Sequence, residues 1–246
     1  MHYLIGIDDT DNEYSRGTGF RTRDLASKIH ENKLGKVISI SRHQLYVHPE
    51  IPFTSHNSSA CMHIETNNLE QLKIFSAEYL TSESVEGSDV GLCIVDYKRI
   101  SDTVVNWGIR AKKEILVQIE ANQIAKQDGV YLEGFLGTRG GIIGALAAVG
   151  LRKTGNDGRL FWISGKELRE FNGIYKVSDI LENSNFDQII SANGTGVELN
   201  HNIFVNDWLR PVLKNNKICV IVEPSKNHSE YEWNIASKEY IKNISD

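Results

Sequence analysis

Three carboxylates crowd the end of an apolar segment near the start of the chain. Asp8, Asp9 and Asp11 follow directly after Tyr3-Leu4-Ile5-Gly6-Ile7. Negative charges this close oppose one another's ionisation, so the group is costly unless a cation or hydrogen-bond donors lie among them. Mg²⁺ takes oxygen ligands and usually brings phosphate groups with it. The pattern predicts a magnesium and phosphate site, and a solvated acidic turn after a strand is the plain alternative.

A second signal for phosphate lies far along the chain, in a glycine-rich segment that opens an alanine-rich apolar run. Residues 137–144 have the form of a turn leading into a helix, where backbone N–H groups favour an anion. Arg139 can fork onto phosphate oxygens beside the amides of Gly140 and Gly141. The segment is neither a Walker A loop nor a Rossmann fingerprint. The alternative is that Gly144 and the alanines only allow close helix packing.

The loop after the acidic cluster contributes a third set of candidates. Thr18 and the run Arg21-Thr22-Arg23 stand near the start of a predicted helix. Arginines and a hydroxyl at a helix start suit an anion, although a threonine there can also be the N-cap. We expect Thr22 to contact phosphate or to accept it transiently, with Arg21 or Arg23 as a clamp.

A polar loop between two predicted strands offers a substrate-binding surface through His56, Asn57 and Ser58. Other histidines lie nearby in the sequence, but isolated histidines on strands rarely ligate metals, so we expect no histidine metal site. The three cysteines, Cys61, Cys93 and Cys219, are widely spaced in apolar or alternating stretches. We expect them to be reduced core residues and not zinc ligands.

The composition is that of an ordinary globular protein, with 246 residues, 40% of them hydrophobic and 24% charged. A net charge of −5 argues against a broad nucleic-acid-binding face. The apolar runs fall short of the roughly 20 residues that span a bilayer. Since the N-terminus enters a strand pattern at once, we expect no signal peptide, no membrane contact and a cytoplasmic location.

Residues 1–100 follow the order strand, helix, strand, strand, helix, strand, which is that of a ferredoxin-like βαββαβ unit. Residues 101–246 add a helical segment, broken near Leu116, the glycine-rich loop and a C-terminal α/β portion. The expected class is α+β, either as two domains or as one intimately packed unit. Residues 164–246 carry no functional signal of their own. The expected strands are Tyr3 to Ile7, Lys36 to Val47, Ser58 to Glu65 and Val90 to Val95, and the expected helices are Arg21 to Glu31 and a segment capped by Asn68.

Three segments together carry a family resemblance: Gly6 to Asp11, Ile51-Pro52-Phe53, and Arg139 to Gly150. In order and spacing they resemble the N-terminal kinase-like and ferredoxin-like portions of archaeal tRNA agmatinylcytidine synthetase. That enzyme uses ATP to activate the wobble cytidine of an isoleucine tRNA and then attaches agmatine. The resemblance covers residues 1–161 and implies that the ferredoxin-like unit packs with a second, α/β kinase-like subdomain.

The resemblance also implies roles for particular residues. The acidic cluster would bind metal and serve phosphoryl transfer, and the glycine-rich loop would contact nucleotide phosphates. Aligned through Leu25-Ala26, the family's phosphorylated threonine falls on Thr22, with Thr18 as the alternative. The residues that inherit the metal and phosphate roles are Asp8, Asp9, Asp11, Arg139, Gly140 and Gly141.

The chain departs from the family in several places. Arg21-Thr22-Arg23 stands where the family has Cys-Thr-Thr, and Thr54 to Ser59 replaces a loop with two basic residues. The family's OB-fold and zinc ribbon, which hold the tRNA, have no counterpart. We therefore expect the phosphoryl chemistry to carry over and the tRNA grip to be missing.

These patterns predict an ATP- and Mg²⁺-dependent phosphotransferase or ligase-type enzyme, acting on a small molecule or a nucleoside-like substrate. One carboxylate of the acidic cluster could act as the base for an attacking hydroxyl. Three alternatives stay open. They are a metal-dependent phosphohydrolase with Asp9 or Asp11 as nucleophile, a non-catalytic nucleotide-binding regulatory module, and a tRNA-modifying enzyme that needs a partner to bind RNA.

Overall fold

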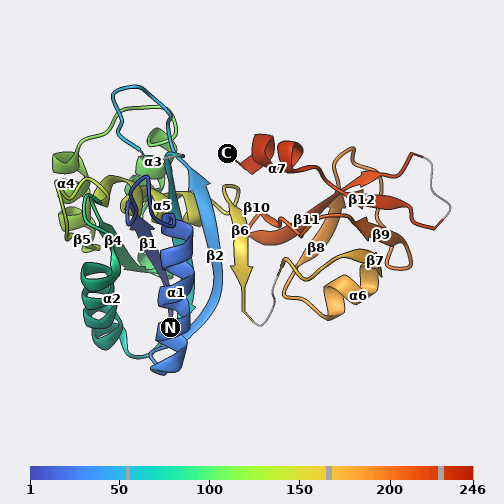
Figure 1. Cartoon of the computed structure of the whole chain (residues 1–246), viewed down its shortest axis with the longest axis horizontal. Helices are drawn as coiled ribbons and strands as arrows, with labels where there is room; N and C mark the ends of the chain where they lie inside the picture. The colour runs from blue at the N-terminus through green and yellow to red at the C-terminus, as the bar shows by residue number, and fades with distance from the viewer. Residues whose placement is uncertain (54–55, 165–167, 227–229, 246) are drawn as a thin grey trace. The chain divides into compact units, whose positions relative to one another are not determined.

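The computed structural model describes residues 1–53, 56–164, 168–226 and 230–245 (Figure 1). The chain forms two compact units, Met1–Thr154 and Gly155–Asp246. Both contain helices and strands, which confirms the expected mixture of α and β structure. The unit boundary lies after Thr154 and not after residue 100, because helix α5 (Ile142–Thr154) packs directly on the first strands of the chain.

The sheet of the first unit has the strand order β5-β4-β1-β3-β2, and every neighbouring pair is antiparallel. Its strands are β1 (His2–Asp8), β2 (Lys36–Gln44), β3 (Ser58–Glu65), β4 (Gly91–Asp96) and β5 (Tyr131–Gly134). Besides α5, its helices are α1 (Thr18–Glu31), α2 (Leu69–Glu83), α3 (Asp102–Arg110) and α4 (Gln118–Asp128), with the short 3₁₀ helix η1 (Tyr97–Arg99).

Helix α5 is apolar around most of its circumference, which is typical of a helix enclosed on all sides. It packs on β1, β3 and β4 and is covered by α3, while α1 packs on β2 and β3 (Figure 1). Its close approach to β1 depends on Gly6, because a Cβ atom there would overlap the carbonyl oxygen of Ala145. The chemistry at the end of β1 is thereby held directly beside the start of α5.

Several expected elements have the predicted bounds, and others differ for a visible reason. Strand β3 covers the predicted residues 58–65, and the helical segment is interrupted between Arg110 and Gln118. Helix α1 begins at Thr18, ahead of Arg21, because the Asp11 carboxylate accepts hydrogen bonds from the Thr18 amide and hydroxyl. The Asn68 side chain was expected to cap α2 but makes no capping hydrogen bond there.

The second unit holds the part of the sequence that was hardest to interpret. Its strand order is β6-β10-β11-β12-β9-β7, and β8 pairs in parallel with β11. A separate apolar core runs from Leu160 to Ile235. Its elements are β6 (Arg159–Ile163), β7 (Gly173–Lys176), α6 (Val177–Glu182), β8 (Gln188–Ser191), β9 (Asn202–Val205), β10 (Val212–Lys214), β11 (Lys217–Pro224), β12 (Trp233–Ile235) and α7 (Lys238–Ser245).

The cysteines are free and buried in the two units, as predicted: Cys61, Cys93 and Cys219. Among the described residues, every helix is too short or too polar to cross a bilayer.

Candidate functional site

The acidic cluster forms a sharp turn directly after β1. Asp8 is the last residue of the strand, and Asp9 has a φ of 54°, a left-handed conformation that residues other than glycine rarely adopt. Such strained positions are concentrated at functional sites. The turn sends the chain from the edge of the sheet toward the start of α1.

Asp11 and two threonines fix the far end of this turn. The Asp11 carboxylate accepts hydrogen bonds from the Thr18 amide at 3.0 Å and from the Thr18 hydroxyl at 2.8 Å. The Thr18 oxygen in turn lies 3.3 Å from both the amide and the hydroxyl of Thr10. Thr10 and Thr18 are almost fully buried. The first residue of α1 is therefore part of the acidic cluster.

The glycine-rich segment meets the acidic cluster at the start of α5. A Cβ atom on Gly144 would overlap the Asp8 carboxylate oxygen Oδ2, and one on Gly141 would come within 3.0 Å of the Asp8 carbonyl oxygen. Only glycine fits at these two positions without displacing Asp8. The two sequence signals, far apart in the chain, lie side by side in the folded unit.

Asp89 joins the two halves of the site and was not among the residues predicted from the sequence. Its carboxylate accepts hydrogen bonds from the Thr138 amide and, at 2.8 Å, from the Thr138 hydroxyl. Its carbonyl accepts the Gly141 amide at 2.7 Å. A signal was available, since β4 begins just after Asp89 and its first residue, Gly91, pairs with Asp8.

Burial and mutual repulsion raise the pKa values of two carboxyl groups here. The pKa of Asp8 is well above its usual value, first because of burial and then because of the charges of Asp9 and Asp11. The pKa of Asp9 rises to about 6 through burial and the charges of Asp89 and Asp11. The site is thus a concentration of negative charge that favours a proton or a cation.

The donor atoms fit magnesium better than a softer metal. The side chains that could ligate are carboxylates, which Mg²⁺ prefers, and one or two of them commonly suffice when phosphate oxygens and water complete the shell. Within the described ranges, no three His, Cys, Asp or Glu side chains are arranged to hold an ion by themselves. A magnesium ion here would therefore need phosphate ligands from a nucleotide.

The remaining phosphate candidates are spread more widely. Arg139 is exposed at the tip of the glycine-rich loop with a φ of 65°, and Gly140 follows it half-buried. Thr22 is fully buried, and its hydroxyl donates to the Thr18 carbonyl at 2.8 Å. Arg21 lies near α2, with Nη1 3.5 Å from the Tyr79 hydroxyl and 3.4 Å from Glu83 Oε2. Arg23 is half-buried on α1.

The polar loop before β3 is tied to β2 at its base. The Asn57 side-chain amide donates to the Tyr46 carbonyl at 2.6 Å, and the Ser58 hydroxyl accepts from Arg42 Nε at 3.0 Å. His56 is exposed, and Thr54 and Ser55 lie outside the described residues. The Asn57 carbonyl accepts the amide of Leu45, whose side chain would contact a Cβ placed on Gly144. The loop base therefore lies next to the site, although Asn57 and Ser58 already use polar groups structurally.

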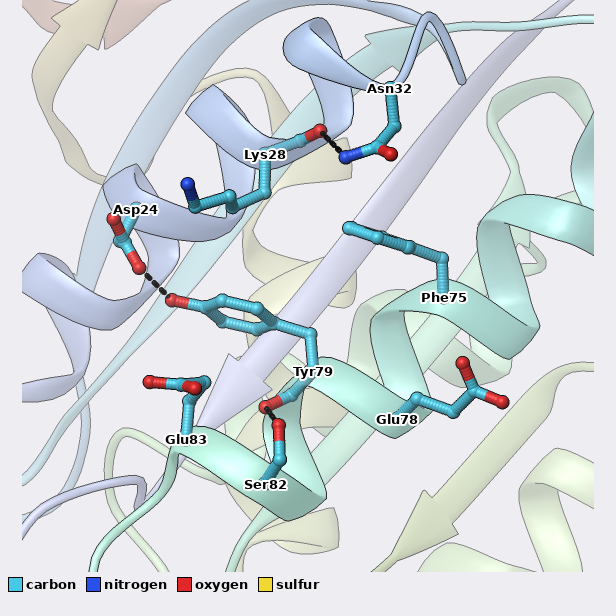
Figure 2. Close-up of a pocket in the computed structure, with 8 residues that line it drawn as sticks. All are labelled: Asp24, Lys28, Asn32, Phe75, Glu78, Tyr79, Ser82 and Glu83. Carbon is cyan, nitrogen blue, oxygen red and sulfur yellow. Dashed lines mark hydrogen bonds between the residues drawn. The ribbon is translucent and has the colours of Figure 1, made fainter.

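A hollow of about 470 Å³ lies between α1 and α2, away from the glycine-rich loop (Figure 2). Phe75 and Tyr79 lie along one wall, and the Tyr79 hydroxyl donates to the Asp24 carboxylate. None of the acidic cluster or glycine-loop residues lines it. Its lining residues are Asp24, Lys28, Asn32, Phe75, Glu78, Tyr79, Ser82 and Glu83.

The fold and the site define a class of α/β protein in which a carboxylate cluster at a strand end faces a glycine-rich helix start. No family model and no curated protein matches the chain. Solved structures do match, and those with the strongest likeness are tRNA-modifying enzymes by name.

Apo TiaS, the tRNAIle2 agmatidine synthetase, is 26% identical with a TM-score of 0.53, over 61% of this chain and 35% of that chain. A tRNA fluorescent labeling enzyme is 27% identical with a TM-score of 0.55, over 61% and 36%. The complex of TiaS with tRNAIle2 and ATP is 27% identical with a TM-score of 0.54, over 61% and 36%. The resemblance to tRNA agmatinylcytidine synthetase is thereby confirmed, and the matched part spans just over a third of those structures.

The raised pKa of Asp9 predicts a pH-dependent cost to the metal-free fold. Folding raises this pKa from 3.8 to about 6, so the folded state holds the proton more tightly and loses stability as pH rises through that window. Asp9→Asn, which also tolerates a positive φ, should be more stable than the wild type at pH 7 by on the order of 1–3 kcal/mol. Denaturant unfolding with a chelator present measures this.

At pH 4 the difference between Asp9→Asn and the wild type should nearly vanish. The exposed Glu86→Gln is the matched control and should follow the wild-type profile. An Asp9→Asn protein that is less stable than the wild type at pH 7 would show that the carboxylate is not crowded.

Proposed function

We propose that this chain is an ATP-using tRNA-modifying enzyme, or the catalytic part of one, with its nucleotide site where β1 meets α5. The single observation that carries the proposal is the contact of Asp8 with Gly144 and Gly141. It brings a cation-seeking cluster and an anion-seeking helix start to one place. Structures with this likeness include complexes of TiaS with tRNAIle2 and ATP, and with AMPCPP and agmatine.

Two parts of the first unit correspond to the expected architecture. Strands β1 to β4 with α1 and α2 have the order of a ferredoxin-like unit, since the antiparallel sheet runs β4-β1-β3-β2. Helices α3 to α5 with β5 would be the kinase-like subdomain that carries the glycine-rich loop. Both parts share β1 and its acidic end, so the proposed site belongs to neither alone.

A divalent cation reconciles the two halves of the site. Phosphate placed at the start of α5 would lie beside Asp8 and Asp89, and the negative charges would repel one another. Mg²⁺ bound by the carboxylates would neutralise phosphate charge. Asp8 and Asp9 are the proposed ligands, and Asp11 holds the start of α1 through Thr18.

Arg139 is the proposed mobile charge of the site. It is exposed, so its guanidinium can fold over phosphate oxygens of a bound nucleotide. The Gly141 amide already donates to Asp89, which fixes the loop, and the half-buried Gly140 is the better amide contact for phosphate. Gly144 acts by leaving room for the Asp8 carboxylate.

Thr18 suits the role of a phosphate-contacting or phosphate-accepting hydroxyl better than Thr22. Its oxygen lies 2.8 Å from a carboxylate that can orient it or take its proton. The Thr22 hydroxyl is fully buried and bonded within α1. We therefore move the proposed role from Thr22 to Thr18.

The substrate proposed is tRNA and not a free small molecule, because the matched structures with a named substrate contain tRNA. The chain itself has a net charge of −5, so it offers no general basic face for RNA. We propose that a further domain or partner supplies the phosphate-backbone contacts, while this site acts on the nucleotide presented to it.

The direct test is ATP turnover with Mg²⁺, agmatine and a tRNAIle2 transcript. We expect nucleotide consumption that requires the tRNA and falls by at least 10²-fold in Asp8→Asn, since an electrostatic contact in the reacting site is lost. Asp24→Asn, an equal change on α1 outside the site, should keep the wild-type rate. Consumption with a small acceptor and no tRNA would favour the phosphotransferase, and turnover of a phosphate ester without ATP would favour the phosphohydrolase.

Thr18 and Thr22 provide an internal comparison on one helix. Thr18→Val should reduce ATP turnover by more than tenfold, because the hydroxyl that faces Asp11 is removed. Thr22→Val removes a hydroxyl of the same kind that bonds only to the Thr18 carbonyl, and turnover should stay within about twofold of the wild type. Equal losses in the two variants would remove the basis for placing Thr18 at the reacting end.

A further inference from the structure

Arg152, on the last turns of α5, is a buried charge without a counter-ion. Only 8% of its surface is exposed. Its Nη2 donates to the Ser39 hydroxyl at 2.9 Å, while Nη1 is buried and has no hydrogen-bond partner among the described residues. An unpaired buried charge costs several kcal/mol, and an arginine keeps its proton under such conditions.

The groups around Arg152 add positive charge or donors. The charges that act on its pKa come from Cys61 and Tyr97, neither of which is a carboxylate. His63 is half-buried, and its Nε2 lies 3.2 Å from Nδ1 of His2. Burial, then Arg152 and His2, lower the pKa of His63 to about 4. An anion in this place would be welcomed by each of these side chains.

Lys153 and Tyr97 close the group on another side. Lys153 Nζ lies 3.9 Å from the centre of the Tyr97 ring and donates to the Tyr97 carbonyl at 2.9 Å. The His63 ring stacks on the same tyrosine with ring centres 5.6 Å apart. The rings and the lysine hold His63 in place beside Arg152.

This group is separate from the proposed nucleotide site. His63 pairs with Leu4, near the beginning of β1, whereas Asp8 ends that strand. Arg152 stands eight residues after Gly144 on α5, which corresponds to about 12 Å along a helix. An ion bound here would not touch the acidic cluster.

We propose that Arg152 Nη1 and the His63 imidazole bind a small phosphate-type oxyanion. A guanidinium offers parallel N–H donors that match two oxygens of such an ion. The depth of Arg152 excludes the backbone of a nucleic acid, so the ion is either free phosphate or the terminal phosphate of a small ester. This site is independent of the proposed function.

The test is thermal unfolding of the whole chain in sodium phosphate against sodium chloride of equal ionic strength. The wild type should gain a saturable rise in Tm of roughly 3–5 °C at ten times the dissociation constant. Arg152→Met should lose that rise and be at least as stable as the wild type without phosphate, because it removes an unpaired buried charge. Arg139→Ala and Arg99→Gln should keep it.

A second measurement does not depend on stability. Phosphate should shift the imidazole NMR signals of His63 in the wild type and leave them unmoved in Arg152→Met. A nucleoside monophosphate that gives the same shifts identifies an ester as ligand, while a response to inorganic phosphate alone identifies the free ion. No saturable effect of either, or an equal effect in Arg152→Met, overturns the proposal.

Discussion

The structure depends on how closely α5 approaches the end of β1. Gly6, Gly141 and Gly144 each lie where a Cβ atom would overlap the facing backbone or the Asp8 carboxylate. This contact buries the apolar face of α5 on the central strands and sets the start of a helix against crowded carboxylates. One packing constraint therefore builds the core of the first unit and assembles its candidate site.

The electrostatic cost of that arrangement gives the site its character. Burial and repulsion raise the pKa values of Asp8 and Asp9, so the empty site is under strain that a cation relieves. The left-handed conformations at Asp9 and Arg139 place further strain on both sides of it. Evolution retains such costs mainly where a ligand offsets them, and the matched structures contain ATP and tRNA. The proposed function follows from this balance of charge.

Local patterns predicted the strands and helices of the first unit well, because alternating and helical periodicity reflect burial directly. They also singled out both halves of the site. They could not show Asp89, whose role comes from the pairing of β4 with β1, a contact between distant residues. They placed the reactive hydroxyl on Thr22, although the cap formed by Asp11 starts α1 at Thr18. The short, weakly periodic strands of the second unit gave little local signal, since their stability comes from a core formed by distant segments.

The central claim is that the acidic cluster and the glycine-rich loop bind one nucleotide. Amide NMR with substoichiometric Mn²⁺ and ATP tests it directly, since the paramagnetic ion broadens signals near the metal. Signals of residues 8–11 and 140–144 should broaden together, and only when ATP and Mn²⁺ are both present. Broadening of the acidic turn without the loop, or no dependence on ATP, would contradict the account.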